Sequence, residues 1–315
     1  MKVNIAVLSY HSKDLLAQFL PSILVAAARS RHDCRVTVVD NCSTDGSEAF
    51  VRTHFPTVRW WPAKSNRVLC SYNEFAAEST DDILILLNND IRLEEDFVDP
   101  MVEPFLAADD VLFVASHGDC SRPLFLWGVL SAEIYDEDYQ TRIEKPGRAL
   151  SAGIGAFDRL KFLELGGYDD LYLPGRYEDI DLCYRGWKRG WKGIYQPLGR
   201  KDHVGGVSFS RAFSSAKTEA MVFRNGVLFM VKNIRDPWFL TRFALLLPVR
   251  LAAAAVRGRW HYFSGLSEAV RRLPAAFASR ARVKSQAVLS DRDALRAAAG
   301  AEDIKVHATT SGGRS

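Results

Sequence analysis

Short apolar runs alternate with helical patterns along residues 1–90, and this alternation limits the fold more than any other feature of the chain. The strands that we expect are 3–10, 35–40, 58–61 and 83–87, with helices at 14–29, 47–55 and 72–79. Strands that alternate with helices in this way are typical of βαβ units. We therefore predict an α/β fold with a Rossmann-like, mostly parallel sheet that is flanked by helices on both faces.

The regular alternation ends near residue 115, where Gly-rich and aromatic segments replace it. Beyond this point we expect a loop or hairpin at 128–143, helices at 158–165 and 178–190, and a helical region at 216–299. Three prolines, Pro237, Pro248 and Pro274, are predicted to break the helical region. This pattern divides the chain into segments 1–115, 116–235, a C-terminal helical extension at 236–299 and a disordered tail at 300–315.

Charge and cysteine content exclude several classes of protein. The net charge of +3 is too small to indicate a nucleic-acid partner. Residues 235–284 nevertheless contain ten Lys and Arg against two acidic residues, a local net charge of +8, so the rest of the chain is acidic. Five scattered cysteines without a C-x-x-C pair argue against a disulfide framework or a zinc site, and they favour a reducing cytoplasm.

Targeting and membrane signals are expected to be absent. Met1 and Lys2 lead directly into the first strand, without a charged leader followed by an apolar segment, so we predict no signal peptide. The most apolar late stretch, 239–256, is interrupted by Arg242, Pro248 and Arg250. An uninterrupted spanning helix needs roughly 20 apolar residues, so we predict no transmembrane segment.

Polar residues follow two of the expected strands at the sheet edge where α/β proteins bind ligands. Asp40 ends the strand at 35–40, and its carboxylate can accept hydrogen bonds from a nucleobase or a ribose. Asn88 and Asp90 follow the strand at 83–87 and lie on one side of an extended chain. Their oxygens suit Mg²⁺ or Mn²⁺, with water and a diphosphate completing the coordination. The alternative is an ordinary turn of Asn and Asp residues.

A third group of acidic residues opens the helix expected at 178–190. Asp181 and Arg185 stand four residues apart and are interpreted as a surface pair. Glu178 and Asp179 are adjacent, and the repulsion between two carboxylates raises the proton affinity of one, which suits it to act as a general base. Further along, His203 precedes a Gly-Gly turn and is either a turn residue or a ligand.

These segments, in this order, resemble the inverting family 2 glycosyltransferases of the GT-A fold. The resemblance covers about residues 3–235 and rests on "VLSYHS", "VVDNCSTDGS", "LLNNDIRL", "YEDIDLCYR" and "HVGGVSF". It implies that 1–115 binds a nucleotide-sugar and that 116–235 binds the acceptor and carries catalysis. The loop "SNRVLCSYN" departs from the family pattern because it lacks the usual glycines.

The resemblance also implies roles for individual residues. Asp179 would be the general base with Glu178 as a supporting carboxylate, and a divalent metal, Mg²⁺ or Mn²⁺, would be held by Asp90, Asn88 and His203. The donor would be bound by Ser9, Tyr10, Asp40, Asn66, Asn73 and Asn89.

The reaction implied by the resemblance is transfer of a sugar, rhamnose or a related one, from a nucleoside diphosphate donor with inversion. The favoured donor nucleotides are dTDP and UDP, and the acceptor is a lipid-linked or cell-surface glycan. The alternatives are a transferase that uses polyprenyl phosphate as the acceptor and a nucleotide-sugar-binding protein without turnover. The implied location is cytoplasmic, with peripheral attachment to the inner face of a bacterial plasma membrane as a further option.

The basic C-terminal segment adds an expectation about membranes. Arg242, Arg250 and Arg257 are spaced eight and seven residues apart, which places them in one quadrant of an unbroken helix. Tryptophans at 238 and 260 lie near them. The region 238–284 therefore either attaches to an anionic membrane through its arginine face or packs on the catalytic domain.

Overall fold

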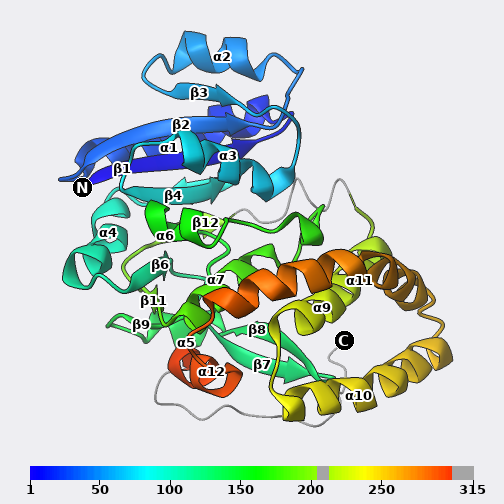
Figure 1. Cartoon of the computed structure of the whole chain (residues 1–315). Helices are drawn as coiled ribbons and strands as arrows, with labels where there is room; N and C mark the ends of the chain where they lie inside the picture. The colour runs from blue at the N-terminus through cyan, green and yellow to red at the C-terminus, as the bar shows by residue number, and fades with distance from the viewer. Residues whose placement is uncertain (204–212, 300–315) are drawn as a thin grey trace.

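The computed structural model of the chain describes residues 1–203 and 213–299, and its centre is an eight-stranded sheet in the order β3-β2-β1-β4-β10-β6-β11-β9 (Figure 1). The strands of this sheet are β1 (Lys2–Ser9), β2 (Asp33–Asp40), β3 (Arg59–Pro62), β4 (Ile83–Asn88), β6 (Val111–Ala115), β9 (Gly147–Arg148), β10 (Gly155–Asp158) and β11 (Lys192–Tyr195). Two smaller pairs are β5 (Ile91–Leu93) with β12 (Lys201–His203), and β7 (Ser121–Leu126) with β8 (Val129–Ile134).

The helices surround this sheet and continue into a C-terminal bundle. They are α1 (Lys13–Arg29), α2 (Ser47–His54), α3 (Ser71–Glu78), α4 (Val98–Ala107), α5 (Glu137–Thr141), α6 (Arg159–Glu164), α7 (Glu178–Arg189), α9 (Ser215–Asn233), α10 (Pro237–Val256), α11 (His261–Gln286) and α12 (Asp291–Ala299). Two 3-10 turns, η1 (Val68–Cys70) and η2 (Asp170–Tyr172), lie in the loops. The strands and helices predicted before residue 90 are confirmed.

Both faces of the sheet are buried, as the apolar runs predicted. In β4, Ile85 and Leu87 belong to a core that α1 and α4 complete, whereas Leu84 and Leu86 belong to a second core with α3, α6 and α7. Successive side chains of a strand point to opposite faces, so a continuous aliphatic run is what a sheet covered on both sides requires.

Strand direction brings the polar strand ends to one edge. Strands β1, β2, β3 and β4 are mutually parallel, and the register pairs Ser9 with Asp40 and Leu8 with Asn88. Strand β10 runs antiparallel between β4 and β6, with Gly155 opposite Leu86 and Ala115. The chain therefore enters β10 at the same edge where β4 and β6 end, an arrangement that the sequence pattern did not predict.

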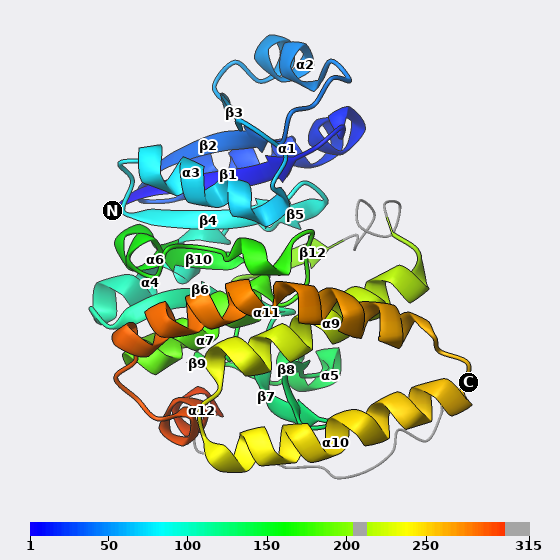
Figure 2. The same ribbon diagram turned by 45° about the vertical axis from the view of Figure 1, so that its right-hand side comes forward.

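The C-terminal helices pack on elements of residues 116–235 and share their cores. A third core joins α9, α10 and α11 to α7 and to the β7–β8 hairpin. The segment 128–143, predicted as a loop or hairpin, supplies only the second strand of this hairpin and then forms α5. Helix α11 lies beside α9 in both views (Figures 1 and 2). Helix α12 contributes Ala294 and Ala298 to the core on the sheet.

The predicted helix breaks at Pro248 and Pro274 are wrong. Helix α10 runs through Pro248 and α11 runs through Pro274, whereas Pro237 does start a helix, with the Asp236 carboxylate accepting a hydrogen bond from the amide of Trp238. An interior proline costs a backbone hydrogen bond, and packing on either side of it can offset that cost. In α10 the buried Phe243 and Ala254 flank Pro248 in this way.

The expectation of no spanning segment relied on an interruption of the apolar stretch at Pro248, and the structure does not show that interruption. Because α10 continues through Pro248, it is a 20-residue helix that is long and apolar enough to cross a membrane by length and composition alone. Among the residues that the structure describes, it is the one helix that meets this criterion, and 17% of its most apolar window is buried.

Candidate functional site

The first side of the site is formed where β1 and β2 end. Asp40 is buried, and its carboxylate accepts hydrogen bonds from the amide of Ser43 at 3.0 and 3.2 Å. Ser9 lies opposite Asp40 in the ladder. Tyr10 follows on the surface, 48% exposed, with its ring stacked on His11 at 4.2 Å between centroids. Three of the residues predicted to bind the donor thus share one strand edge.

The end of β4 contributes the second part of this edge. Asn88 ends the strand, and the buried Asn89 and Asp90 form the turn into β5. Strand β5 pairs with β12 in a register that sets His203 opposite Ile91. The backbone therefore brings the strand that carries His203 alongside Asp90, while the His203 side chain lies outside the described part of the structure.

The side chains at this edge show what kind of metal site they could form. Within residues 1–203 and 213–299, no three His, Cys, Asp or Glu side chains form a group that could hold a metal ion. Asp90 and Asn88 provide hard oxygens at one turn, and hard cations in such sites often take their remaining ligands from water and phosphate. The residues present fit a cation that is bound largely by a diphosphate, rather than one held by a protein cage.

Two of the predicted donor residues have other contacts. The Asn66 side chain accepts a hydrogen bond from the amide of Val68 at 3.1 Å, at the start of η1. The Asn73 side chain donates to the carbonyl of Tyr168 and accepts from its amide, both at 2.8 Å. These hydrogen bonds show that both asparagines help to hold loop conformation.

The catalytic candidates lie at the start of α7. Burial, with a smaller contribution from the charge of Asp179, raises the pKa of Glu178 from its usual 4.5 to about 8. Burial also raises the pKa of Asp179. Glu178 is therefore mostly protonated at neutral pH, and it adds little negative charge beside Asp179.

Asp119 is a functional candidate that the sequence pattern missed. A Cβ atom placed on Gly153 would lie 3.6 Å from Oδ2 of Asp179 and 3.8 Å from Oδ1 of Asp119. Gly153 is exposed, so both carboxylates border the same open space at the strand edge. Lys201 Nζ lies 3.3 Å from Asp119. Asp119 could have been found because it follows the apolar run 111–115, as Asp40 and Asp90 follow theirs.

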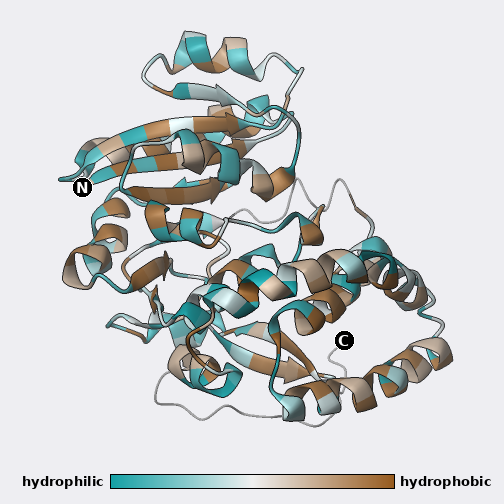
Figure 3. Ribbon diagram, in the orientation of Figure 1, coloured by the Kyte–Doolittle hydropathy of each residue, from teal (hydrophilic) through white to brown (hydrophobic). Residues whose placement is uncertain are grey.

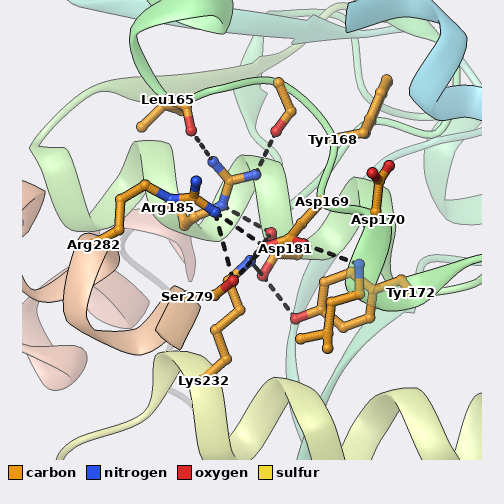
Figure 4. Close-up of polar contacts among 12 residues, drawn as sticks. Leu165, Tyr168, Asp169, Asp170, Tyr172, Asp181, Arg185, Lys232, Ser279 and Arg282 are labelled. Atoms are coloured by element: carbon orange, nitrogen blue, oxygen red, sulfur yellow. Dashed lines mark hydrogen bonds and ion pairs between the residues drawn. The ribbon is translucent and has the colours of Figure 1, made fainter. Parts of the chain in front are cut away.

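Asp181 and Arg185 are buried, so the interpretation as a surface pair is wrong. Figure 4 shows Asp181 at the centre of a network of polar contacts that reaches α9. Its carboxylate lies 2.7 Å from Lys232 Nζ and accepts hydrogen bonds from Arg185 Nε, Asn233 Nδ2 and the Tyr172 hydroxyl, each at 2.8 Å.

The charges within this network compensate one another. Burial alone would raise the pKa of Asp181, but Lys232 and Arg185 hold that pKa well below its usual value. Lys232 also lies 2.8 Å from Asp169, and the same cation holds the pKa of Asp169 below its usual value against the effect of burial. The network ties the first turn of α7 to α9.

The loop that enters α7 is held by the same C-terminal helices. Arg176 and Tyr177 both adopt left-handed backbone conformations, with φ of 73° and 76°. The buried Asn225 of α9 donates its side-chain amide to the carbonyls of Gly175 at 2.8 Å and Arg176 at 2.7 Å. Arg272 of α11 donates to the carbonyl of Leu173 at 2.9 Å. Side chains from α9 and α11 thus support the strained residues before Glu178.

A cavity of about 220 Å³ lies beside this network rather than at the strand edge. Arg67, Asp169, Lys232 and Arg282 are among its lining residues. Arg67 pairs with Asp170, and Lys232 pairs with Asp169. Because these lining charges are already paired, we interpret the cavity as part of the structural network.

Known proteins were compared with the chain by sequence and by fold. A family model described as Glycosyl transferase family 2 matches residues 4–163. The chain is 25% identical over 227 residues to a Mycobacterium tuberculosis protein named N-acetylglucosaminyl-diphospho-decaprenol L-rhamnosyltransferase, and the match covers 61% of this chain and 73% of that protein.

Solved structures of GT-A glycosyltransferases share the fold. The crystal structure of GalNAc-T7 with UDP, GalNAc and Mn²⁺ gives a TM-score of 0.58 at 14% identity and covers 75% of this chain, which spans 48% of GalNAc-T7. S. aureus TarS 1–349 in complex with UDP-GlcNAc gives a TM-score of 0.56 at 12% identity, covering 94% of this chain and 90% of that one. The fold is GT-A, and the chain belongs to glycosyl transferase family 2.

Proposed function

We propose that the chain transfers a sugar from a nucleoside diphosphate to an acceptor hydroxyl in a single inverting step. The observation that carries this proposal is the position of Asp179, whose carboxylate borders the open space above Gly153 together with Asp119. Asp40 ends β2, and Asp90 follows the end of β4 at the same edge. A donor bound along these strand ends would present its anomeric carbon to an acceptor hydroxyl held beside Asp179.

Asp179 takes the proton of the acceptor hydroxyl as the new bond forms, and inversion follows because the hydroxyl attacks opposite the leaving diphosphate. Glu178 supports this role by remaining protonated near neutral pH, which spares Asp179 a second adjacent negative charge. The pKa of Asp179 is itself raised, so its carboxylate is a stronger base than an ordinary exposed one.

The donor side of the proposal assigns Ser9, Tyr10, Asp40 and Asn89 to the nucleotide-sugar, and Asp90, Asn88 and His203 to a divalent cation. When bound, Mg²⁺ or Mn²⁺ would neutralise charge on the diphosphate. The Mn²⁺ named with GalNAc-T7 supports this assignment. Asp40 is suited to the nucleobase or ribose, because it is an acceptor at the strand edge.

The finer choice of substrates rests on the relatives' names. The name of the mycobacterial relative supports L-rhamnose as the sugar and a lipid-linked glycan as the acceptor. The UDP and UDP-GlcNAc named with the solved neighbours support UDP as one donor nucleotide, and dTDP is the other that we favour.

Thermal shift with nucleotides tests the donor site. UDP, dTDP, GDP and CDP would each be added with and without Mn²⁺ to the wild type, to Asp90→Ala and to Asp33→Ala. Asp33 begins β2 at the opposite edge of the sheet and is a matched control. We expect stabilisation by UDP or dTDP that depends on Mn²⁺, is lost in Asp90→Ala and is kept in Asp33→Ala. Equal stabilisation of all three proteins would contradict the assignment of Asp90.

A further inference from the structure

Helix α10 exposes a continuous apolar stripe along its length, which we call the α10 stripe. Its members recur at spacings of three and four residues, the period of one helix face. The α10 stripe consists of Trp238, Thr241, Ala244, Leu245, Pro248, Val249, Ala252 and Val256, all exposed and none of them charged. Leu245 is 67% exposed and Val256 is 90% exposed. Water therefore faces the apolar side of this helix.

The opposite side of α10 holds its arginines against the protein. The Arg250 guanidinium lies over the rings of Phe223 at 4.9 Å and Tyr262 at 5.5 Å. Arg242 is partly buried, with a buried Nε atom. Of the two alternatives from the sequence, this arrangement argues against attachment through the arginine face, and it leaves the apolar face of the helix exposed.

The hairpin turn between β7 and β8 places further apolar side chains beside α10. A Cβ atom on Gly128 would lie 2.8 Å from the Cα of Phe243, so the turn abuts the helix. Leu126 and Trp127 in this turn are 49% and 38% exposed. Figure 2 shows the hairpin above α10, which forms the lower edge of the molecule, and Figure 3 shows how much of α10 is apolar.

Charge and aromatic residues at the ends of α10 identify the partner. Trp238 lies in the first turn of α10 and Trp260 follows its last turn. They are 58% and 66% exposed, and tryptophan is enriched at membrane interfaces. Arg257 and Arg259 are exposed directly after the helix. A second protein copy would not require cations at the rim of an apolar stripe, whereas anionic lipid headgroups complement them.

We propose that the α10 stripe inserts into the headgroup and upper acyl region of an anionic lipid bilayer, with the helix parallel to the membrane plane. The proposal concerns lipid binding alone and stands whether or not the sugar-transfer assignments hold. Lipid binding also extends the proposed function, because the inserted stripe would hold the catalytic domain at the surface where a lipid-linked acceptor lies.

The packing of α10 excludes a spanning orientation for the folded protein. Phe239 stacks on Phe125 at 4.6 Å between ring centroids, and Arg250 contacts rings from α9 and α11, so one side of α10 is attached to the domain at both ends. If α10 crossed the bilayer, α11 would begin on the far side. Arg272 of α11 could not then donate to the carbonyl of Leu173, as it does here.

Co-sedimentation of the full chain with vesicles tests the proposal. The vesicles would be phosphatidylglycerol mixed with phosphatidylcholine, or phosphatidylcholine alone. We expect the wild type to bind the anionic vesicles, and Leu245→Glu to bind them at least about tenfold more weakly, because a leucine that would insert into the lipid is exchanged for a charge. Leu160→Glu on α6 is the matched control, since Leu160 is also 67% exposed, and its binding should equal that of the wild type.

A second variant separates the electrostatic contribution. Arg257→Ala should weaken binding to anionic vesicles about fivefold and leave binding to phosphatidylcholine unchanged. Circular dichroism and sedimentation velocity would accompany each variant. Equal binding by the wild type and Leu245→Glu, or no binding by the wild type, would overturn the proposal. The proposal would also be overturned if the wild type formed a dimer and bound no lipid, and if Leu245→Glu were a monomer. A second copy of the chain would then cover the α10 stripe.

Discussion

Asp40 ends β2 and Asp90 lies in the turn after β4, whereas Asp179 lies in the first turn of α7, which side chains from α9 and α11 hold in place. On the donor side, backbone ladders between β1, β2 and β4 set the register of the polar residues. On the catalytic side, the first turn of α7 depends on the buried charges of Asp181 and Lys232.

This difference indicates where the site is vulnerable. A ladder shares its hydrogen bonds among many backbone groups, so a single side-chain change at a strand end alters the chemistry and leaves the frame intact. A buried ionic network depends on each member, because the loss of one partner leaves another charge buried without compensation. Substitutions on the two sides should therefore have different effects on activity and stability.

The largest effect is expected for Asp179→Asn, which removes the proposed base and keeps the shape of the side chain. Turnover should fall by about 10²- to 10⁴-fold, while the thermal shift produced by the donor nucleotide stays that of the wild type. Steady-state kinetics and nucleotide titration would measure the two quantities. Retention of the wild-type turnover would remove Asp179 from the base role.

The next largest effect is expected on stability, when the buried network loses its lysine. Lys232→Met leaves Asp181 and Asp169 without their shared cation, so the free energy of unfolding should fall by about 3–5 kcal/mol. Urea unfolding would measure it. Arg52→Ala is the control, because the Arg52–Glu48 pair at 2.8 Å is exposed and should contribute no more than about 0.5 kcal/mol. If both variants lost a similar free energy of unfolding, the buried network would contribute no more to stability than an exposed ion pair.

A smaller effect concerns pH. The pKa of Glu178 is raised from 4.5 to about 8, so between these values the folded protein binds a proton that the unfolded chain has released. Stability from this group is therefore lost as pH rises. Glu178→Gln removes the effect, and its stability relative to the wild type should increase by up to about 1.4 kcal/mol per pH unit over that interval.

Urea unfolding of both proteins at pH 5, 6.5 and 8 would measure this increase. Asp181 provides a comparison with the opposite sign, since its lowered pKa gives stability that is present at neutral pH and lost in acid. A constant difference between Glu178→Gln and the wild type would show that Glu178 ionises freely in the folded state.

The sequence by itself was sufficient for the four parallel strands before residue 90 and for the polar residues at their edge. Aliphatic runs such as 83–87 are local, and a short continuous run of this kind between helical patterns is typical of a strand covered on both faces. Asp40 and Asp90 were recognised for the same reason, because each ends such a run and parallel strands end at a common edge.

Only the tertiary structure decided which charges are buried and which face of α10 meets water. Asp181 pairs with Lys232 from a helix 51 residues away, and no local pattern distinguishes that aspartate from one on a surface. Gly153 brings Asp119 and Asp179 to one space through an antiparallel strand that the pattern did not reveal. Helix α10 turns Arg250 inward, where its guanidinium lies over the rings of Phe223 and Tyr262. Residues distant in sequence determine which charged side chains are buried and which way a helix face points. Local sequence patterns do not identify those residues.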